Sequence, residues 1–395
     1  MTFDLYTASA VAFIVLLAIL VVKDRDKFTR DSIMLLRKTQ RGKAFLTRLG
    51  ERHPTFWKYV GMAGVFVGFG MSIWILWTFV NLSMANIISP KPESGLSLVL
   101  PSPGPSAQIL PGVIAVPFWY WIITIALLAI VHEGMHGVMA AREKIRIKSL
   151  GWGLLLVIPL AFVEPDEKQL QKKSVWAQLR VFAAGSFANF VLGTLCLLLL
   201  SFTIGYAYQP NGVAFGELLT GSPAQAANLT GTILAIDGSR INGLQDLVTA
   251  LEQAGVGKEI EIATSTPGGE KAYRLTTIQH PDLPNSSRGY IGIGGLAEYL
   301  TLKPAFAGLA GVFAFLAGTA PFYSLQNGGL LFYLAVLNIG IGAFNMMPIK
   351  ALDGGRMWEL AFQRVSRKHT PKVLNAITVV LIGLILLNFA SVLVR

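Results

Sequence analysis

Two histidines and a glutamate stand within five residues of an apolar stretch, as His132-Glu133-Gly134-Met135-His136. On a helix, positions i and i+4 share a face, so both imidazoles can reach one metal ion. Glu133 lies about 100° round the helix from His132, where it can take a proton from a water molecule at an open coordination position. The pattern predicts a zinc-dependent hydrolytic site with Glu133 as the general base.

A catalytic zinc ion usually takes three protein ligands and one water molecule, so a third ligand must come from elsewhere in the chain. Asp353 ends a later apolar stretch and is expected on the same membrane face as the two histidines. Asp-Gly-Gly is also a common turn sequence, which is the alternative interpretation of this residue. His53, His280 and His369 are predicted to be surface residues.

The composition indicates a membrane protein that crosses the bilayer several times. Of the 395 residues, 53% are apolar and only 14% are charged, whereas soluble domains carry about 25% charged residues. Cys196 is the single cysteine, which excludes an intramolecular disulfide and a multi-cysteine zinc site. The net charge is +11, and the basic residues are expected in cytoplasmic loops next to the lipid bilayer. No nucleic-acid partner is expected.

Six apolar segments are long enough to be membrane spans, and the first is expected to be retained as a helix. The basic segment 23–56 is predicted to be cytoplasmic and to form an amphipathic helix on anionic lipid. This orientation places His132, His136 and Asp353 near the cytoplasmic side. The six predicted spans are 6–22, 57–82, 114–140, 176–206, 329–349 and 373–394.

Two further segments are predicted to enter the membrane without crossing it. Residues 303–323 are apolar, but only one crossing can separate an outer domain from the basic cluster after Asp353, so this segment is expected to be re-entrant or peripheral. Residues 144–163 alternate in polarity, contain Gly151 and Gly153, and then become apolar. They predict a strand, a turn at the glycines and a second strand, in a hairpin that dips into the membrane.

The expected organisation has four parts. Residues 1–113 hold the first two spans and the basic loop, and 114–206 form the first half of a membrane core that contains the His132–His136 sequence. Residues 207–297 form a soluble domain on the outer side, because charged residues and short strands return there. Residues 298–395 form the second half of the core. The fold class is a polytopic α-helical membrane protein with one inserted α+β domain.

The chain resembles the site-2 protease family of intramembrane zinc metalloproteases. The resemblance rests on the HEGMH sequence, on Asn345 to Gly354 as N-x-x-P-x-x-x-L-D-G, and on Gly185 to Asn189 as G-x-x-x-N. The 144–163 hairpin is similar to that family's membrane-reentrant β-loop. Ser186 stands where the family often has a proline, which should alter only the local helix path.

The resemblance implies a role for each matched residue. His132, His136 and Asp353 would bind one zinc ion per chain, and Glu133 would act as general base and then as proton donor. Asn189 and Asn345 would steady the substrate peptide or its oxyanion. The alternative for these two asparagines is a polar contact between helices.

The soluble domain is similar to a PDZ domain. Residues 221–224 begin a short helix, Ile233–Ile236 form a strand, Asp237-Gly238 form a turn, and 244–254 form an amphipathic helix. Such domains bind an extended peptide at a sheet edge. The alternative is a spacer that excludes substrates with large outer domains.

The expected function is zinc-dependent cleavage of membrane-protein substrates within their transmembrane segments. A prenyl-protein type of membrane protease is one alternative, and it would use a glutamate as third ligand. A second is a non-catalytic scaffold or receptor that uses the PDZ-like domain. A third is a transporter, which should show internal hydropathy repeats that the sequence lacks.

Overall fold

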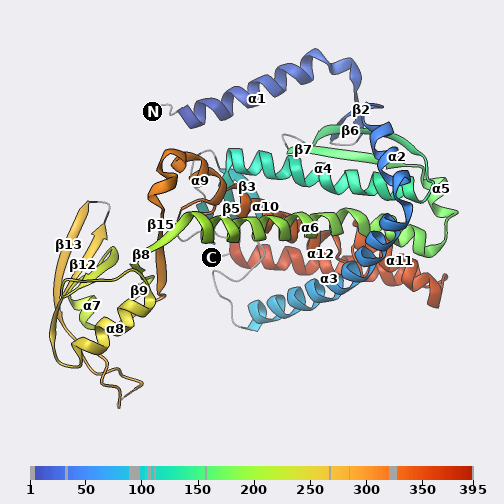
Figure 1. Cartoon of the computed structure of the whole chain (residues 1–395). Helices are drawn as coiled ribbons and strands as arrows, with labels where there is room; N and C mark the ends of the chain where they lie inside the picture. Colours follow the sequence, from blue (N-terminus) through green and yellow to red (C-terminus); the bar gives the residue numbers. More distant parts are fainter. Residues whose placement is uncertain are drawn as a thin grey trace. The chain divides into compact units, whose positions relative to one another are not determined.

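The computed structural model describes residues 5–31, 34–88, 98–102, 104, 108–110, 113–155, 158–266, 268–283, 285–319 and 327–393. The chain divides into two compact units. The first, here called the helical unit, comprises residues 1–198 and 330–395. The second, here called the β-rich unit, comprises residues 199–329. Figure 1 colours the elements of both units along the sequence.

Five of the described helices are long and apolar enough to cross a membrane. Their outward-facing leucine, valine and phenylalanine side chains are largely exposed, which fits contact with lipid rather than water. The predicted span 329–349 corresponds to α10 (Leu330–Asn345), whose 16 residues are fewer than the roughly 20 that a full crossing needs. The five long helices are α1 (Leu5–Lys23), α3 (Pro54–Ile88), α4 (Phe118–Arg142), α6 (Val175–Ala207) and α12 (Thr370–Leu393).

A four-stranded antiparallel sheet packs against α4 (Figure 1). Its order is β1-β2-β6-β7, so β7 forms one edge. The hairpin of β6 and β7 occupies the segment that was predicted to be strand, turn and strand. Its members are β1 (Phe28–Asp31), β2 (Met34–Thr39), β6 (Ile147–Leu155) and β7 (Ile158–Pro165).

The predicted turn position in this hairpin is wrong. Gly151 and Gly153 lie inside β6, and the connection to β7 falls at 156–157, outside the described residues. A Cβ on Gly151 would lie 2.2 Å from the carbonyl oxygen of Arg37 and 2.7 Å from the ring of Phe162. These glycines therefore let side chains of the flanking strands lie over β6, and they are packing residues rather than turn residues.

The single amphipathic helix predicted for 23–56 is also wrong in part. Only Lys43–Arg52 forms such a helix, α2, while η1 (Arg25–Lys27), β1 and β2 precede it. β2 pairs with β6 along its whole length. The Nζ of Lys38 in β2 lies 3.0 Å from Oε2 of Glu164 in β7. The positive charge of this segment had suggested a helix on lipid, whereas part of that charge, on Lys38, is paired with Glu164 across the sheet.

Asp353 begins a helix instead of ending a span. α10 ends at Asn345, a short irregular segment follows, and α11 (Asp353–Val365) starts at Asp353 itself. Gly354 allows this sharp return, because a Cβ there would lie 2.1 Å from the carbonyl oxygen of Met346. Side chains of α3, α6, α10 and α11 share one buried core around Met346 and Met357, which fixes the start of α11 beside α6.

The predicted loop 83–113 contains strands, and the third long helix starts later than predicted. β3 (Leu98–Ser102), β4 (Gln108–Leu110) and β5 (Val113–Pro117) form a small sheet in order β3-β5-β4, and α4 follows β5 directly. The remainder of that loop, at 89–97, 103, 105–107 and 111–112, lies outside the described residues. The short α5 (Glu167–Gln171) connects β7 to α6.

The β-rich unit holds a six-stranded sheet in which β13-β12-β10-β8-β15 are neighbours in that order and β11 pairs with β10. The predicted short helix is confirmed as α7 (Pro223–Ala226), the strand as β10 (Thr232–Ile236), and the second helix as α8 (Leu244–Ala254). Ile233, Ile262 and Leu247 are among its fully buried core residues. The other strands are β8 (Tyr208–Ala214), β9 (Glu217–Leu218), β11 (Ser239–Arg240), β12 (Glu259–Thr266), β13 (Gly269–Thr276), β14 (Ile293–Gly294) and β15 (Ala297–Leu302).

The segment 303–323 forms short helices in its described part. η2 (Pro304–Leu309) and α9 (Ala310–Ala317) are each too short to cross a bilayer. This agrees with the prediction that the segment is not a full span, and residues 320–323 lie outside the described part.

Candidate metal centre

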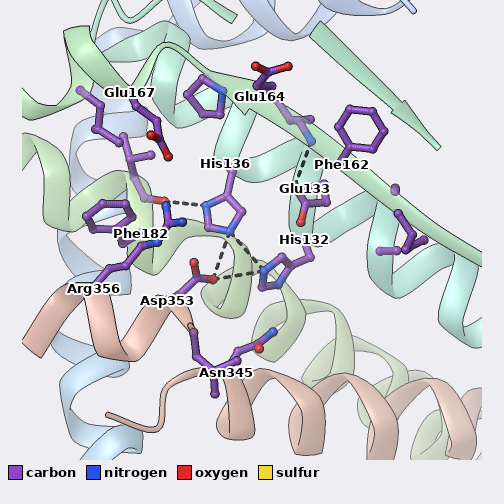
Figure 2. Close-up of a pocket in the computed structure, with 18 of the residues that line it drawn as sticks. His132, Glu133, His136, Phe162, Glu164, Glu167, Phe182, Asn345, Asp353 and Arg356 are labelled. Atoms are coloured by element: carbon purple, nitrogen blue, oxygen red, sulfur yellow. Dashed lines mark hydrogen bonds and ion pairs between the residues drawn. The ribbon is translucent and has the colours of Figure 1, made fainter. Parts of the chain in front are cut away.

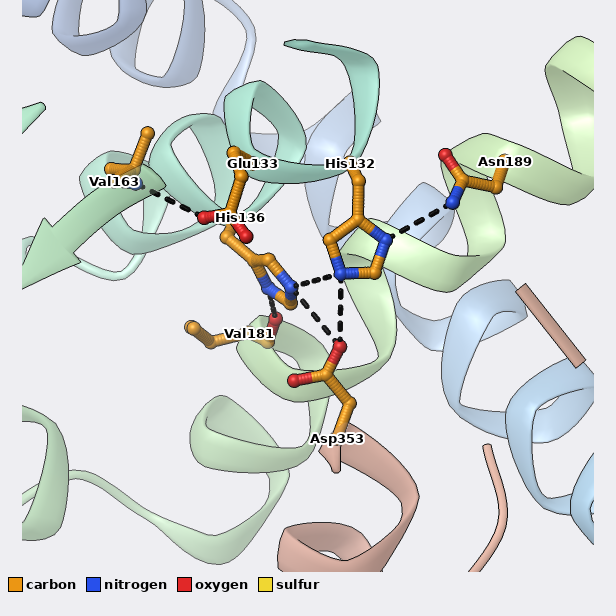
Figure 3. A network of polar contacts seen from close by, with 7 residues as sticks. All are labelled: His132, Glu133, His136, Val163, Val181, Asn189 and Asp353. Atoms are coloured by element: carbon orange, nitrogen blue, oxygen red, sulfur yellow. Dashed lines mark hydrogen bonds and ion pairs between the residues drawn. The ribbon is translucent and has the colours of Figure 1, made fainter. Parts of the chain in front are cut away.

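Three side chains from two helices converge on one point in the helical unit. The Nε2 atoms of His132 and His136 on α4 are 3.1 Å apart, and each lies 3.2 Å from Oδ2 of Asp353 on α11. Figure 3 shows the two imidazoles and the carboxylate pointing toward one another. The described residues contain this one group of three ligand-type side chains suited to a metal ion.

The size of this triangle fits a tetrahedral zinc site. With ligand distances of about 2.0–2.1 Å, the ligand atoms of a tetrahedron lie roughly 3.3 Å apart. The Nδ1 of His136 lies 2.7 Å from the carbonyl oxygen of Val181, so Nδ1 carries the proton and Nε2 presents a lone pair. A metal ion among these atoms would take that lone pair together with those of Nε2 of His132 and Oδ2 of Asp353.

His132 has a partner on its other nitrogen as well. The carboxamide of Asn189 on α6 lies 3.1 Å from Nδ1 of His132, and its Oδ1 is buried without another partner in the described structure. Rotating the carboxamide by 180° brings Oδ1 to Nδ1, where it accepts that proton and leaves Nε2 free for a metal. With the carboxamide in that orientation, both histidines present an Nε2 lone pair to the centre.

α6 approaches the centre through a glycine. A Cβ built on Gly185 would lie 2.4 Å from Nε2 of His136 and 2.7 Å from Nε2 of His132. Any side chain at this position would occupy the space among the ligand atoms. Gly185, the first residue of the G-x-x-x-N segment, thus leaves space for the ligand atoms. Asn189, one turn later, contacts His132.

Glu133 lies beside the triangle and is held by the sheet. Its Oε2 accepts a hydrogen bond of 3.0 Å from the backbone N–H of Val163 in β7. Figure 3 shows this contact on the side of His132 away from Asn189. The base predicted from the sequence is therefore next to the metal ligands but is not part of their triangle.

These residues line a cavity of about 780 Å³ in the helical unit. Asn345 at the end of α10 lines it too, and Figure 2 places its side chain near His132 and Asp353. The edge strand β7 contributes Leu160 to Pro165 to the wall. The cavity therefore joins the metal centre, the base and a strand edge.

Charged side chains of both signs stand in the cavity wall. Hydrogen bonds from Ser149 and Lys38 hold the pKa of Glu164 below its usual range. The guanidinium of Arg356 lies 5.5 Å from the ring centre of Phe182, in a cation–π contact. Arg356 stands three residues after Asp353 on α11, so the two share a helix face.

The structure places six predicted residues around one cavity and its metal centre: His132, Glu133, His136, Asn189, Asn345 and Asp353. His53 and His369 are exposed and do not belong to the ligand group. Sequence reasoning did not single out Val163 or Arg356. The i+3 spacing from Asp353 could have indicated Arg356, whereas a backbone N–H such as that of Val163 leaves no residue-type signal.

Comparison with known proteins agrees with this geometry. Residues 120–389, more than half of the chain, match the profile of peptidase family M50. The zinc metalloprotease RasP of Shouchella clausii is 27% identical over 255 residues, which cover 57% of this chain and 60% of that protein. This chain thus spans less than two thirds of RasP.

Two other relatives are matched over more of their length. CPE1693 of Clostridium perfringens is 25% identical over 331 residues, covering 69% of this chain and 95% of the relative. MJ0971 of Methanocaldococcus jannaschii is 24% identical over 371 residues, covering 93% and 88%. The chain belongs to peptidase family M50, the site-2 protease family, and its described residues hold a His-His-Asp group that could bind a metal ion.

Proposed function

We propose that this protein cleaves membrane-protein substrates within their transmembrane segments. The observation that carries the proposal is the convergence of His132, His136 and Asp353 at distances of 3.1–3.2 Å, in a cavity that Glu133 and the edge of β7 also line. The two histidines belong to a helix long and apolar enough to cross the bilayer. Polar residues are costly there and usually functional.

One zinc ion held by these three side chains would polarise a peptide carbonyl and lower the pKa of a water molecule to about 7. Glu133 is the base that accepts the proton of the attacking water, and it then donates this proton to the leaving amine nitrogen. Asn189 orients His132 by its contact with Nδ1. Asn345, which also lines the cavity, steadies the substrate or its oxyanion.

The sheet edge is proposed to hold the substrate. A transmembrane helix hides its carbonyl groups in internal hydrogen bonds, so it must unwind before it can be cut. An unwound segment can pair with β7 as an added strand, because no other strand covers that side of β7 in the described sheet. The hairpin β6–β7 would then dip into the membrane from the cytoplasmic side, and cleavage would release a cytoplasmic fragment.

The β-rich unit is proposed to be a PDZ-like domain on the outer side. Its confirmed strand and helices support this assignment, and such a domain can bind an extended peptide at a sheet edge. It can also exclude substrates that still carry large outer domains. The six-span topology and the four-part division at 113, 206 and 297 are proposed from the sequence pattern; five of the six spans match helices that are long and apolar enough to cross a membrane.

The alternatives make different predictions for the same residues. A prenyl-protein type of protease would take a glutamate as third ligand, whereas the triangle contains Asp353. A non-catalytic scaffold would need neither Glu133 nor a complete ligand set. Family membership and the complete site favour the protease over both.

The test is cleavage of a single-span substrate in proteoliposomes, with products mapped by mass spectrometry. We expect a cut inside the span, near the cytoplasmic face, for the zinc-loaded wild type. Glu133→Gln should retain zinc and lose cleavage. A cut in the extramembrane part of the substrate, or an equally active Glu133→Gln variant, would contradict the proposal.

A further inference from the structure

The backbone groups along the open edge of β7 differ in whether they can bond to a further strand. The N–H of Val163 donates to Glu133, so it points away from β6 and toward the cavity. The register of β6 and β7 runs without interruption from Pro159 to Val163. Because the orientation of backbone groups alternates along a strand, Pro159 and Ala161 face the same edge as Val163.

Only one of these three residues can pair fully with a further strand. Pro159 has no N–H to donate. The N–H of Val163 is already used by Glu133. Ala161 is left with both an N–H and a carbonyl group for an added strand, among the described edge-facing residues up to Val163.

We propose that the Val163 N–H is a positioning group for Glu133, so that β7 holds the base at Val163 and receives substrate at Ala161. This inference rests on the proposed function. One carboxylate oxygen of Glu133 is fixed by the strand, and the other remains to accept a proton. The general base and the substrate are then aligned by the same piece of backbone.

The spacing along the strand sets where the cut falls. Two residues of β-strand span roughly 7 Å, so the base is held that far along β7 from the residue that pairs with the substrate. A substrate therefore needs to unwind over only a few residues. Its scissile bond should lie at a constant, short separation from the residue that pairs with Ala161.

Hydrogen–deuterium exchange at single-residue resolution tests the contact without any need for activity. In the full-length, zinc-loaded protein, Glu133→Ala should raise the exchange rate of the Val163 amide at least tenfold. Glu133→Gln is the matched control, because its side-chain carbonyl still accepts the hydrogen bond and protection should persist. The amide of Phe162, which faces β6, is the internal reference. Equal Val163 exchange in wild type and Glu133→Ala would overturn the inference.

Two proline variants test the consequence for catalysis. Val163→Pro removes the N–H that holds Glu133, so kcat should fall at least tenfold with KM within about threefold. Ala161→Pro removes the pairing donor, so KM should rise about tenfold. Both should keep one zinc ion and an unchanged Phe162 amide, because neither position donates to β6. Wild-type turnover by Val163→Pro would overturn the inference.

The two proposals can fail separately. A wild-type protein that cuts no transmembrane segment would contradict the proposed function. The exchange measurement would still decide whether Val163 positions Glu133, since it depends on the contact alone.

Discussion

The Nε2 of His136 lies 3.2 Å from Oδ2 of Asp353, although 217 positions separate the two residues in the chain. This contact joins α4 to the start of α11. Both helices pack against α6, which supplies Gly185 and Asn189 to the same site. The metal centre is therefore also a tertiary link between the two halves of the family-matched region.

Removing the aspartate should remove the metal. We expect wild-type protein to contain about one zinc ion per chain by plasma mass spectrometry, and Asp353→Ala to contain almost none. Glu359→Ala on the same helix is the matched control, because Glu359 is outside the ligand group. Full zinc retention by Asp353→Ala would exclude this residue as an essential ligand and would favour a site with a glutamate ligand.

A single methyl group on α6 should have the same effect. Gly185→Ala places a Cβ 2.4 Å from Nε2 of His136, well inside van der Waals contact, so the imidazoles must move apart and zinc should be lost. Gly340→Ala on α10 is the control, since a Cβ there meets nothing within 4 Å. If Gly185→Ala retained zinc and activity, α6 would have to lie further from the centre.

Local chemistry could be predicted from the sequence because it depends on residues with a fixed spacing. His132 and His136 at i and i+4 must share a helix face, whatever surrounds them. The pairing with Asp353 followed from the predicted orientation, since the two segments were expected to end on the same membrane face. The apolar helices were predictable for a related reason: length and hydropathy are properties of one segment.

The structure of the basic segment depends on partners and was predicted only in part. β2 is a strand because it pairs with β6, and the residues Met34–Thr39 carry no signal that predicts this pairing. Gly151 was assigned to a turn because glycine commonly marks one, yet here it makes room for Arg37 and Phe162. Long-range pairing decided both cases.

Asn189 should act on zinc affinity rather than on folding. Asn189→Ala removes the group beside Nδ1 of His132, and loss of such a supporting contact typically weakens metal binding 10- to 100-fold. Competition with a chelator measures this directly. Asn388→Ala is the control, because Asn388 contacts Ser83 between α12 and α3 and should change thermal stability alone. Equal zinc affinity in both variants would make Asn189 a helix-packing residue.

Acid should loosen the strand edge through Glu164. The pKa of Glu164 is lowered by hydrogen bonds from Ser149 and Lys38. The ionised carboxylate therefore stabilises the folded sheet at pH values above the ordinary glutamate pKa of 4.5. This stabilisation is lost as the pH falls through the lowered pKa. The side chains of Lys38 and Glu164 are 50% and 39% exposed, so the effect is small. Glu164→Gln should modestly speed amide exchange in β7 at pH 7. The difference from wild type should disappear in strong acid, and a difference that grew there would contradict this assignment.

The cost of unwinding should govern which transmembrane segments are cut. Relative to alanine, each glycine destabilises a helix by about 1 kcal/mol and each proline by about 3 kcal/mol. These residues therefore reduce the free energy that the enzyme must supply to unwind the substrate helix. A substrate with one central glycine should be cleaved roughly fivefold faster than its alanine counterpart, if the whole difference appears in the transition state.

Proline should help more when it lies beside the segment that pairs with Ala161. Within that segment it should hinder, because it removes a hydrogen-bond donor. Moving one proline along the substrate and measuring kcat/KM in proteoliposomes gives this profile, with Glu133→Gln as the blank. A rate that is independent of proline position would mean that unwinding and strand pairing do not limit the reaction.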